Sequence, residues 1–332
     1  MTAGLFQNLC SMTTPRIVRA VVAMLLFTAT GFAQDAPDSS LGALESHPHD
    51  PIVVRSRPVI ERLPVSVVEP TDIQTTPGGD LLIADRKAQT VIRLSETGES
   101  SIVSRDHAGV HRLHTDRDDN VFVLSVSGNS SQIEQITPEG KHVPLCSLPF
   151  AAVAFTRDSV GEMIVARSNG DLWRVTSENA VSRFARLRTG VIDMALSSTE
   201  QLELLTAGGR VLLVTADGQV NAEKYAPTNA TRLFALPEGN LATLCPSAGT
   251  RPLIARVSLE PVTSPAVFAY VPVGTVSVAF DTLGNLSLAN PDLRAVTQVT
   301  SRFRVPCPHC SREVDMIFST DAPAATGRTR SF

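Results

Sequence analysis

The chain has 332 residues, 43% of them hydrophobic and 19% charged, which is enough for a large folded core. Its 20 glycines and 22 prolines are too few for a collagen-like or low-complexity protein. The net charge of −4 argues against a general nucleic-acid-binding surface, so we expect no nucleic acid among the partners. Aromatic residues make up only 5% of the chain, which disfavours an aromatic-lined sugar cleft.

Residues 1–33 are typical of a secretory signal peptide. Arg16 and Arg19 precede the apolar run AVVAMLLF, and small residues lead to a cleavage site after Ala33. Met12 is an alternative start, and an uncleaved anchor is the alternative to cleavage. The apolar run is short for a bilayer crossing. We therefore expect a protein outside the cytoplasm, periplasmic or secreted, with no membrane span in the mature chain.

Residues 34–58 are rich in Pro, Asp and Ser and show no sustained period, which indicates a flexible linker. His47 and His49 lie in this segment. A metal site needs three or four converging ligands, so we interpret these two histidines as solvated.

A turn followed by a short apolar strand recurs along the chain. The six copies are Gly79-Asp80-Leu81, Asp119-Asn120-Val121, Gly161-Glu162-Met163, Glu200-Gln201-Leu202, Gly239-Asn240-Leu241 and Gly284-Asn285-Leu286. Their middle residues lie at intervals of 40, 42, 39, 39 and 45. Constant spacing of this kind is the signature of a repeat architecture.

Each copy has the same internal order of segments. An apolar strand precedes the turn, as in Thr71–Thr75, Arg112–Thr115, Ala152–Phe155, Ile192–Leu196, Arg232–Leu236 and Ser277–Phe280. An alternating strand follows the turn, then a third strand, a second turn and a weaker fourth strand. Four strands in about 40 residues predict a propeller blade. The sequence therefore predicts an all-β fold, a six-bladed β-propeller of four-stranded blades.

The first copy, PTDIQTTPGGDLLIADRKAQTVIRL, resembles the repeat of NHL-repeat propellers and of the related gluconolactonase-like family. The matching residues are Asp72, Pro77, Gly79, Asp80, Ala84, Asp85 and Arg93. The resemblance covers residues 65–305 and weakens in the fourth and fifth copies. It implies a six-bladed propeller, a fold that carries many different functions.

Ring closure requires an outer strand from one end of the chain. Val59–Val68 and Arg302–Val305 both suit this role, and we favour the N-terminal segment. The expected organisation is a signal peptide (1–33), a linker (34–58), the propeller (59–305), and a C-terminal CPHC segment with a disordered tail (306–332).

The resemblance also implies a possible metal site, because lactonases of this family bind a divalent metal in the central channel. They use a Glu in an EGP motif, Asn residues and an Asp on inner strands. Here Glu69-Pro70 lacks the glycine, and only Asp193 and Asn229 offer further candidates. A hard cation takes six or more oxygen ligands. We therefore expect no metal or other cofactor, and a divalent metal such as calcium only if the protein is a lactonase.

The segment DHAGVHRLHTD holds His107, His111 and His114, residue types that ligate zinc or act as general bases. In a strand, residues 111 and 114 face opposite sides. We interpret the three histidines as part of a polar loop on the propeller rim.

Cys307-Pro308-His309-Cys310 matches the redox motif of periplasmic thiol oxidants. Only 22 residues follow it, too few for the domain that such enzymes place around it. We predict a local disulfide between Cys307 and Cys310, with free thiols or a metal site shared between subunits as alternatives. Cys146 and Cys245 are isolated residues of different blades, and their redox state is left open.

The loops between second and third strands lie on the face where propellers usually bind ligands. Five of the six contain or end in basic residues: Arg86 and Lys87, Arg167, Arg210, Arg251, and Arg294. Arginine suits carboxylates and phosphates. We therefore predict a binding or scaffolding module for a protein or an anionic ligand. The alternatives are solvated surface charges without a function, and a metal-dependent lactonase or hydrolase that uses the central channel.

Overall fold

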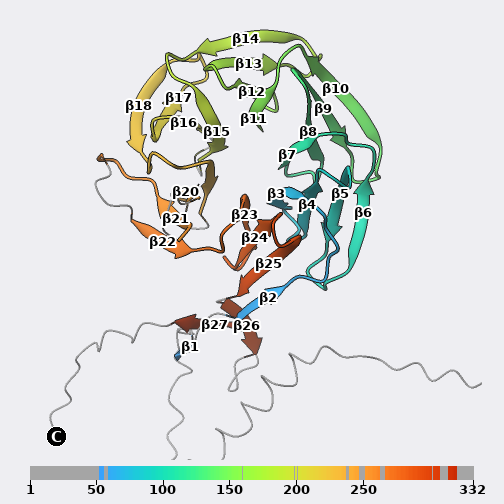
Figure 1. Ribbon diagram of the computed structural model, residues 1–332, viewed down its shortest axis with the longest axis vertical. Coiled ribbons are helices and arrows are strands. Elements are labelled where there is room, and N and C mark those ends of the chain that lie inside the picture. Colours follow the sequence, from blue (N-terminus) through green and yellow to red (C-terminus); the bar gives the residue numbers. More distant parts are fainter. Residues whose placement is uncertain are drawn as a thin grey trace, which may run out of the picture. The chain divides into compact units, whose positions relative to one another are not determined.

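The computed structural model describes residues 52–55, 59–158, 160–197, 199, 201–236, 239–246, 251–261, 266–300, 302–306 and 313–319. Six four-stranded antiparallel sheets form the blades of a β-propeller, so the predicted fold class is confirmed (Figure 1). In the part of the chain that is described, no helix has the length and apolarity that a membrane crossing requires.

The blades follow one another in sequence, each from its innermost strand outward. Blades one to three are β3 (Pro70–Thr75), β4 (Leu81–Asp85), β5 (Thr90–Leu94) and β6 (Ser100–Ser104); β7 (Val110–Thr115), β8 (Val121–Ser127), β9 (Ser130–Ile136) and β10 (His142–Leu148); and β11 (Ala152–Arg157), β12 (Met163–Arg167), β13 (Asp171–Val175) and β14 (Val181–Arg186). Blades four to six are β15 (Val191–Leu196), β16 (Leu202–Thr206), β17 (Arg210–Val214) and β18 (Val220–Tyr225); β19 (Arg232–Ala235), β20 (Leu241–Cys245), β21 (Leu253–Arg256) and β22 (Val267–Tyr270); and β23 (Ser277–Phe280), β24 (Leu286–Asn290) and β25 (Ala295–Thr300), completed by β2 (Val59–Arg62).

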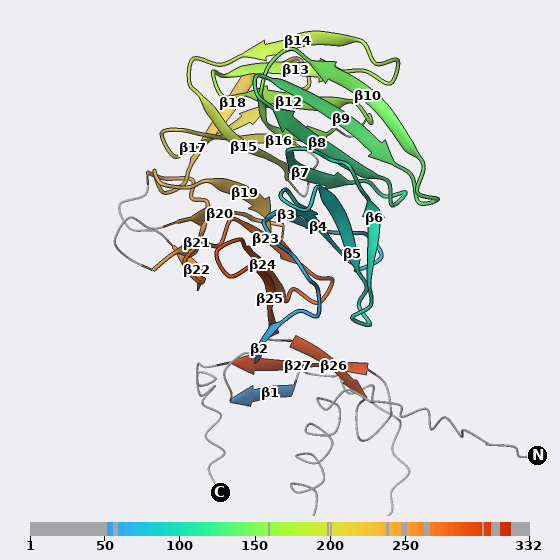
Figure 2. The ribbon, with the colours of Figure 1, turned by 45° about the vertical axis from the view of Figure 1, so that its right-hand side comes forward.

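The N-terminal segment closes the ring, as favoured from the sequence. Strand β2 pairs antiparallel with β25, from Val59 opposite Thr300 to Arg62 opposite Thr297. It thus covers the edge that blade six would otherwise expose. The competing segment lies in β26 (Arg302–Pro306), which pairs with β27 (Glu313–Ser319) in a separate three-stranded sheet with β1 (Ile52–Arg55). Figure 2 shows β27 between β1 and β26.

The repeated turn is the hairpin between the first and second strands of a blade. In blade one the Thr76 amide donates to the Asp80 carbonyl oxygen, and the Gly79 amide donates to the Thr76 carbonyl oxygen. Gly79 has a φ of 92°, and Asp119 takes the corresponding place in blade two with a φ of 61°. Gly, Asn and Asp tolerate this conformation best, which is why their recurrence reveals the blades in the sequence.

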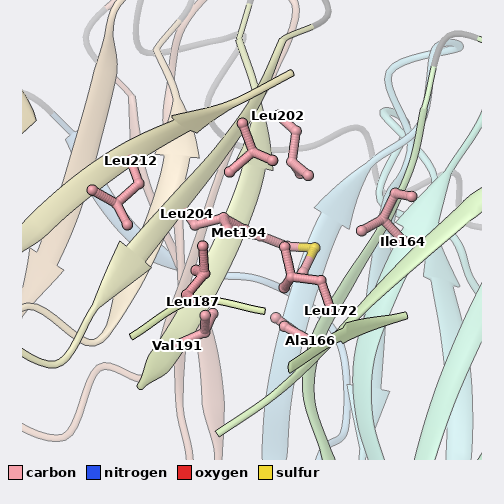
Figure 3. Packing of buried hydrophobic residues seen from close by; sticks show 11 residues of the cluster. Ile164, Ala166, Leu172, Leu187, Val191, Met194, Leu202, Leu204 and Leu212 are labelled. Carbon is pink, nitrogen blue, oxygen red and sulfur yellow. The ribbon is translucent and has the colours of Figure 1, made fainter. Parts of the chain in front are cut away.

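The hydrophobic core is divided among the six interfaces between neighbouring blades. One cluster packs Ile164, Ala166 and Leu172 of blade three against Met194 and Leu204 of blade four (Figure 3). Equivalent clusters join the other neighbouring pairs, including blades six and one. The apolar stripes of consecutive strands thus hold the six innermost strands around one central channel.

Candidate functional site

The central channel contains a cavity of about 540 Å³, which lies in the usual size range of ligand sites. All six innermost strands line it. The strand registers identify one equivalent position in every blade, next to the start of the innermost strand. We call these residues the channel girdle; in blade order they are Asp72, Arg112, Ala154, Asp193, Arg232 and Ser277.

The girdle repeats its chemistry after three blades, as Asp-Arg-Ala and then Asp-Arg-Ser. Blades three places apart are opposite each other in a six-bladed ring. The two aspartates therefore come from opposite blades, and so do the two arginines. Two acidic and two basic residues meet in the channel with a net charge of zero.

The girdle acceptors join neighbouring blades through one repeated hydrogen bond. The Leu113 amide donates to Asp72 Oδ2 over 2.8 Å, and the Leu233 amide donates to Asp193 Oδ2 over 2.9 Å. The Ile73 amide donates to Ser277 Oγ over 3.3 Å. In each case the donor follows the girdle residue of the next blade. These hydrogen bonds link neighbouring blades, and they occupy part of the hydrogen-bond acceptor capacity of Asp72, Asp193 and Ser277.

Arg232 neutralises both aspartates. Its Nη2 donates to Asp72 Oδ1, which also accepts a 2.7 Å hydrogen bond from Ser277 Oγ. Its Nε lies 3.3 Å from Asp193 Oδ2. The Arg232 side chain is only 9% exposed. Burial is the largest single effect and lowers the pKa of Arg232, but the two carboxylates together outweigh it, so the pKa is raised. Arg232 is therefore held as a buried cation.

The positive charge of Arg112 is compensated less completely than that of Arg232. Arg112 Nε lies 3.8 Å from Asp193 Oδ1, beyond hydrogen-bond distance, and Arg112 Nη1 donates to the His111 carbonyl oxygen over 3.2 Å. Burial, together with the nearby charge of Arg232, lowers the pKa of Arg112 to about 10. Among the described residues, Arg112 Nε and Arg232 Nη1 are buried donors without a hydrogen-bond partner. An anion that reached these two donors would supply the hydrogen-bond acceptor that each of them lacks.

Beyond the girdle, the cavity wall towards the far ends of the innermost strands contains both polar and apolar side chains. Phe155, Phe234, Phe280 and Met194 line it. The rings of Phe234 and Phe280 lie 6.0 Å apart, centroid to centroid. The cavity thus combines unpaired cationic donors with an aromatic wall.

The structure separates the three histidines that we expected to share one rim loop. His107 lies in the loop between β6 and β7, whereas His111 and His114 lie on the innermost strand β7, so the rim interpretation is wrong for those two. The strand begins at Val110, earlier than the sequence pattern predicted. Burial, as the largest effect, lowers the pKa of both His111 and His114 to about 4.

The candidate ligands of a lactonase-type metal site do not come together. Glu69 forms an ion pair with Arg86 at the rim, and Asn229 Nδ2 donates to the Pro246 carbonyl oxygen over 3.0 Å. Asp193 lines the channel but is engaged by Leu233 and Arg232. The donor set that the resemblance implies is therefore divided between the rim and the channel.

The six predicted rim residues lie in or beside the loops between second and third strands. Arg86, Lys87, Arg210, Arg251 and Arg294 are exposed and Arg167 is half-buried. Glu69 pairs with Arg86, and Glu223 lies 3.2 Å from Arg210 Nε. Asp85 accepts hydrogen bonds from the amides of Val68, Glu69 and Ala88. A shared ligand-binding role for these six residues stays a prediction.

The cysteines divide between described and undescribed parts of the chain. Cys146 and Cys245 are free thiols. Burial raises the pKa of Cys146 to about 11 and also raises that of Cys245, so both remain protonated at neutral pH. Cys307 and Cys310 lie outside the described residues, as do His47 and His49, and the predicted disulfide stays a prediction.

No protein-family model matches the chain, and no curated protein matches it either. Several solved structures, however, resemble the chain. Virginiamycin B lyase from Staphylococcus aureus superposes with a TM-score of 0.57 at 15% identity, covering 73% of this chain and 98% of that one. A putative gluconolactonase gives a TM-score of 0.55 at 11% identity, covering 77% and 93%. A luciferin-regenerating enzyme gives 0.52 at 13% identity, covering 79% and 99%. These likenesses confirm the resemblance to gluconolactonase-like six-bladed propellers at the level of the fold.

Proposed function

We propose that the protein is an exported binding module whose central channel takes a small carboxylate ligand with an apolar body. The observation that carries this proposal is the pair of buried, unpaired guanidinium donors, Arg112 Nε and Arg232 Nη1. A carboxylate bound there would compensate the two arginines, and its apolar body would lie against Phe155, Phe234 and Phe280. Export rests on the signal-peptide pattern of residues 1–33.

The girdle aspartates support binding over hydrolysis. A general base or a hard metal ion needs a carboxylate with free acceptor capacity. Asp72 accepts from an amide, a hydroxyl and a guanidinium, and Asp193 accepts from an amide beside the same guanidinium. The lactonase alternative has no comparable support, because its candidate ligands Glu69 and Asn229 have separate partners elsewhere.

Isothermal titration calorimetry of the full chain with phenylacetate tests the proposal, and phenylacetamide serves as the uncharged analogue. We expect phenylacetate to bind at least tenfold more tightly than the amide. Arg112→Gln should lose at least tenfold in affinity for phenylacetate, because charge-assisted hydrogen bonds contribute about 1.5–3 kcal/mol.

Arg183→Gln is the matched control, since Arg183 is exposed on the outer strand β14. It should bind phenylacetate as the wild type does. Equal affinity for acid and amide, or an unchanged affinity in Arg112→Gln, would contradict the channel proposal. Calcium-dependent hydrolysis of a lactone by the wild-type chain would favour the lactonase alternative instead.

A further inference from the structure

A second group of polar side chains lies away from the channel, where the outer part of blade one meets blade two. His107 comes from the loop after β6, Glu134 from the middle of β9 and His142 from the start of β10. One ligand atom from each of the three lies within 4.8 Å of the others. His107 is only 4% exposed, whereas Glu134 and His142 are 29% and 41% exposed at the side chain. The group is therefore anchored at one side and accessible at the other.

Ser104, the last residue of β6, fixes both imidazoles in the same orientation. Its Oγ lies 2.5 Å from His107 Nε2 and 3.1 Å from His142 Nε2. The two imidazoles are stacked, with centroids 5.6 Å apart and planes 10° apart. The hydroxyl is also placed to donate to the Arg105 carbonyl oxygen over 3.4 Å. Ser104 Oγ is therefore positioned to accept a hydrogen bond from the N–H group at each Nε2, which leaves both Nδ1 lone pairs free.

The two Nδ1 atoms face one carboxylate oxygen across a gap. Glu134 Oε2 lies 3.9 Å from His107 Nδ1 and 3.7 Å from His142 Nδ1, too far for hydrogen bonds. Two ligand atoms bound to one zinc ion at about 2.1 Å each are about 3.4 Å apart in a tetrahedral site and about 4.2 Å apart when opposite each other. Both observed separations fall within this range.

From this geometry we propose that His107 Nδ1, His142 Nδ1 and Glu134 Oε2 form a binding site for a divalent transition-metal ion, and that zinc is the ion that fits it. Two imidazoles and a carboxylate form a recognised zinc ligand set. Ser104 takes the outer-shell position that orients metal-bound histidines in proteins. Burial lowers the pKa of His107, so that it is unprotonated at neutral pH, the form that a metal ion requires.

Three protein ligands leave a fourth coordination position open to water or to an exchangeable ligand. A surface cavity of about 540 Å³ lies over the group and is lined in part by Asp106 and Arg105. Structural zinc sites are closed by four protein ligands, whereas this one keeps an opening. The site is independent of the channel and of the carboxylate ligand proposed for it.

Zinc titration of the full chain tests the site, with Cys307 and Cys310 replaced by serine in every variant to remove the thiols of the CPHC segment. We expect one zinc ion per chain. Glu134→Gln and His142→Gln should each weaken zinc binding at least tenfold. Ser104→Ala should weaken it about 10- to 100-fold through loss of orientation, and Ser104→Thr should restore it.

Glu139→Gln is the matched control, because Glu139 is an exposed glutamate in the turn after β9 of the same blade. It should bind zinc with the affinity of the unmodified site. Cobalt(II) gives a second readout, since its visible absorption reports the ligand set; the spectrum should change in His142→Gln and stay the same in Glu139→Gln. Absence of stoichiometric zinc in the parent chain overturns the proposal. So does unchanged zinc affinity in both Glu134→Gln and His142→Gln, with circular dichroism showing that the variants are folded.

Discussion

Asp72 and Asp193 lie in the channel with 0% and 4% of their surfaces exposed, and each is held by an amide of the next blade. Buried carboxylates of this kind need a counter-charge, because an unpaired ion in the interior costs several kcal/mol. Arg232 supplies that charge to both aspartates. Arg112 shares only the longer contact with Asp193. The two arginines therefore differ in their partners: Arg232 stabilises the girdle, and Arg112 keeps donor capacity for the proposed ligand.

Substitution of the two arginines should separate these roles. Arg232→Gln removes the ion pair of buried Asp72 and leaves Asp193 with only the 3.8 Å contact to Arg112, so it should lower the free energy of unfolding by roughly 3–5 kcal/mol. Arg112→Gln removes a cation that burial already disfavours, so it should change stability by no more than about 1 kcal/mol. Urea unfolding followed by tryptophan fluorescence measures both. Equal destabilisation by the two substitutions would contradict the assignment.

At the scale of elements, the innermost strands carry the site and β2 holds the ring closed. In blades one to four the register of the innermost strand shifts just before the girdle residue, as between Val110 and Arg112. Such a bulge re-aims the side chains that follow it. Arg112 and His114 both line the cavity as a result.

Loss of β2 should open the ring without removing the core beneath it. A chain that begins at Leu63 keeps Val65 and Val67, which pack between blades six and one, but lacks the pairing with β25. We expect it to be less stable than a chain that begins at residue 57 by roughly 2–4 kcal/mol, on the basis of about 0.5–1.5 kcal/mol for each lost hydrogen bond. Urea midpoints of the two chains measure the difference. Equal midpoints would show that β2 contributes nothing to closure.

The blades could be predicted from the sequence because the hairpin chemistry is local. Gly79, Gly161 and Gly284 take the positive φ angles that the turn requires, and the strands follow at fixed distances. The girdle could not be predicted in this way. Its members are about 40 residues apart, and strict alternation along a strand fails at the bulge before Arg112.

The two proposed sites differ in how much of them the sequence contains. Asp193 stood out as a candidate ligand, but its partner Arg232 comes from the next blade. His107 stood out within a cluster of histidines, yet its neighbours in space are Glu134 and His142, on β9 and β10. In the sequence, residues 104 and 107 lie at the boundary between blades one and two, whereas residues 134 and 142 lie on the two outer strands of blade two. Only the pairing of β9 with β10 and the path of the loop after β6 bring them together.

The stability of the whole molecule depends on six hydrophobic cores between blades and on two histidines near the channel that are hard to protonate in the folded state. His111 lies near Arg112, Arg232 and Asp72, and His114 near Asp116 and Arg157. The His114 ring is also 6.2 Å from both the Phe122 and the Phe155 ring centroids. Both histidines are neutral in the folded protein at pH values at which the unfolded chain already protonates them.

The free energy of unfolding should therefore fall as the pH is lowered from about 6.5 towards 4. The folded-state pKa of each histidine, about 4, lies below its ordinary value of 6.5, so the unfolded chain binds more protons in this interval. Each histidine should contribute roughly 1–3 kcal/mol to the loss. His114→Phe should make the pH dependence shallower in metal-free buffer, as measured by urea midpoints. A variant with the slope of the wild type would show that His114 does not contribute.

A crystal structure of the full chain with 4-bromophenylacetate, with bromine located by its anomalous scattering, tests the proposed function most directly. We expect the carboxylate within hydrogen-bond distance of Arg112 Nε and Arg232 Nη1, and the bromine on the side of Phe234 and Phe280. A carboxylate bound instead at the rim arginines, or a bromine against the girdle with the carboxylate pointing away from it, would contradict the proposed function.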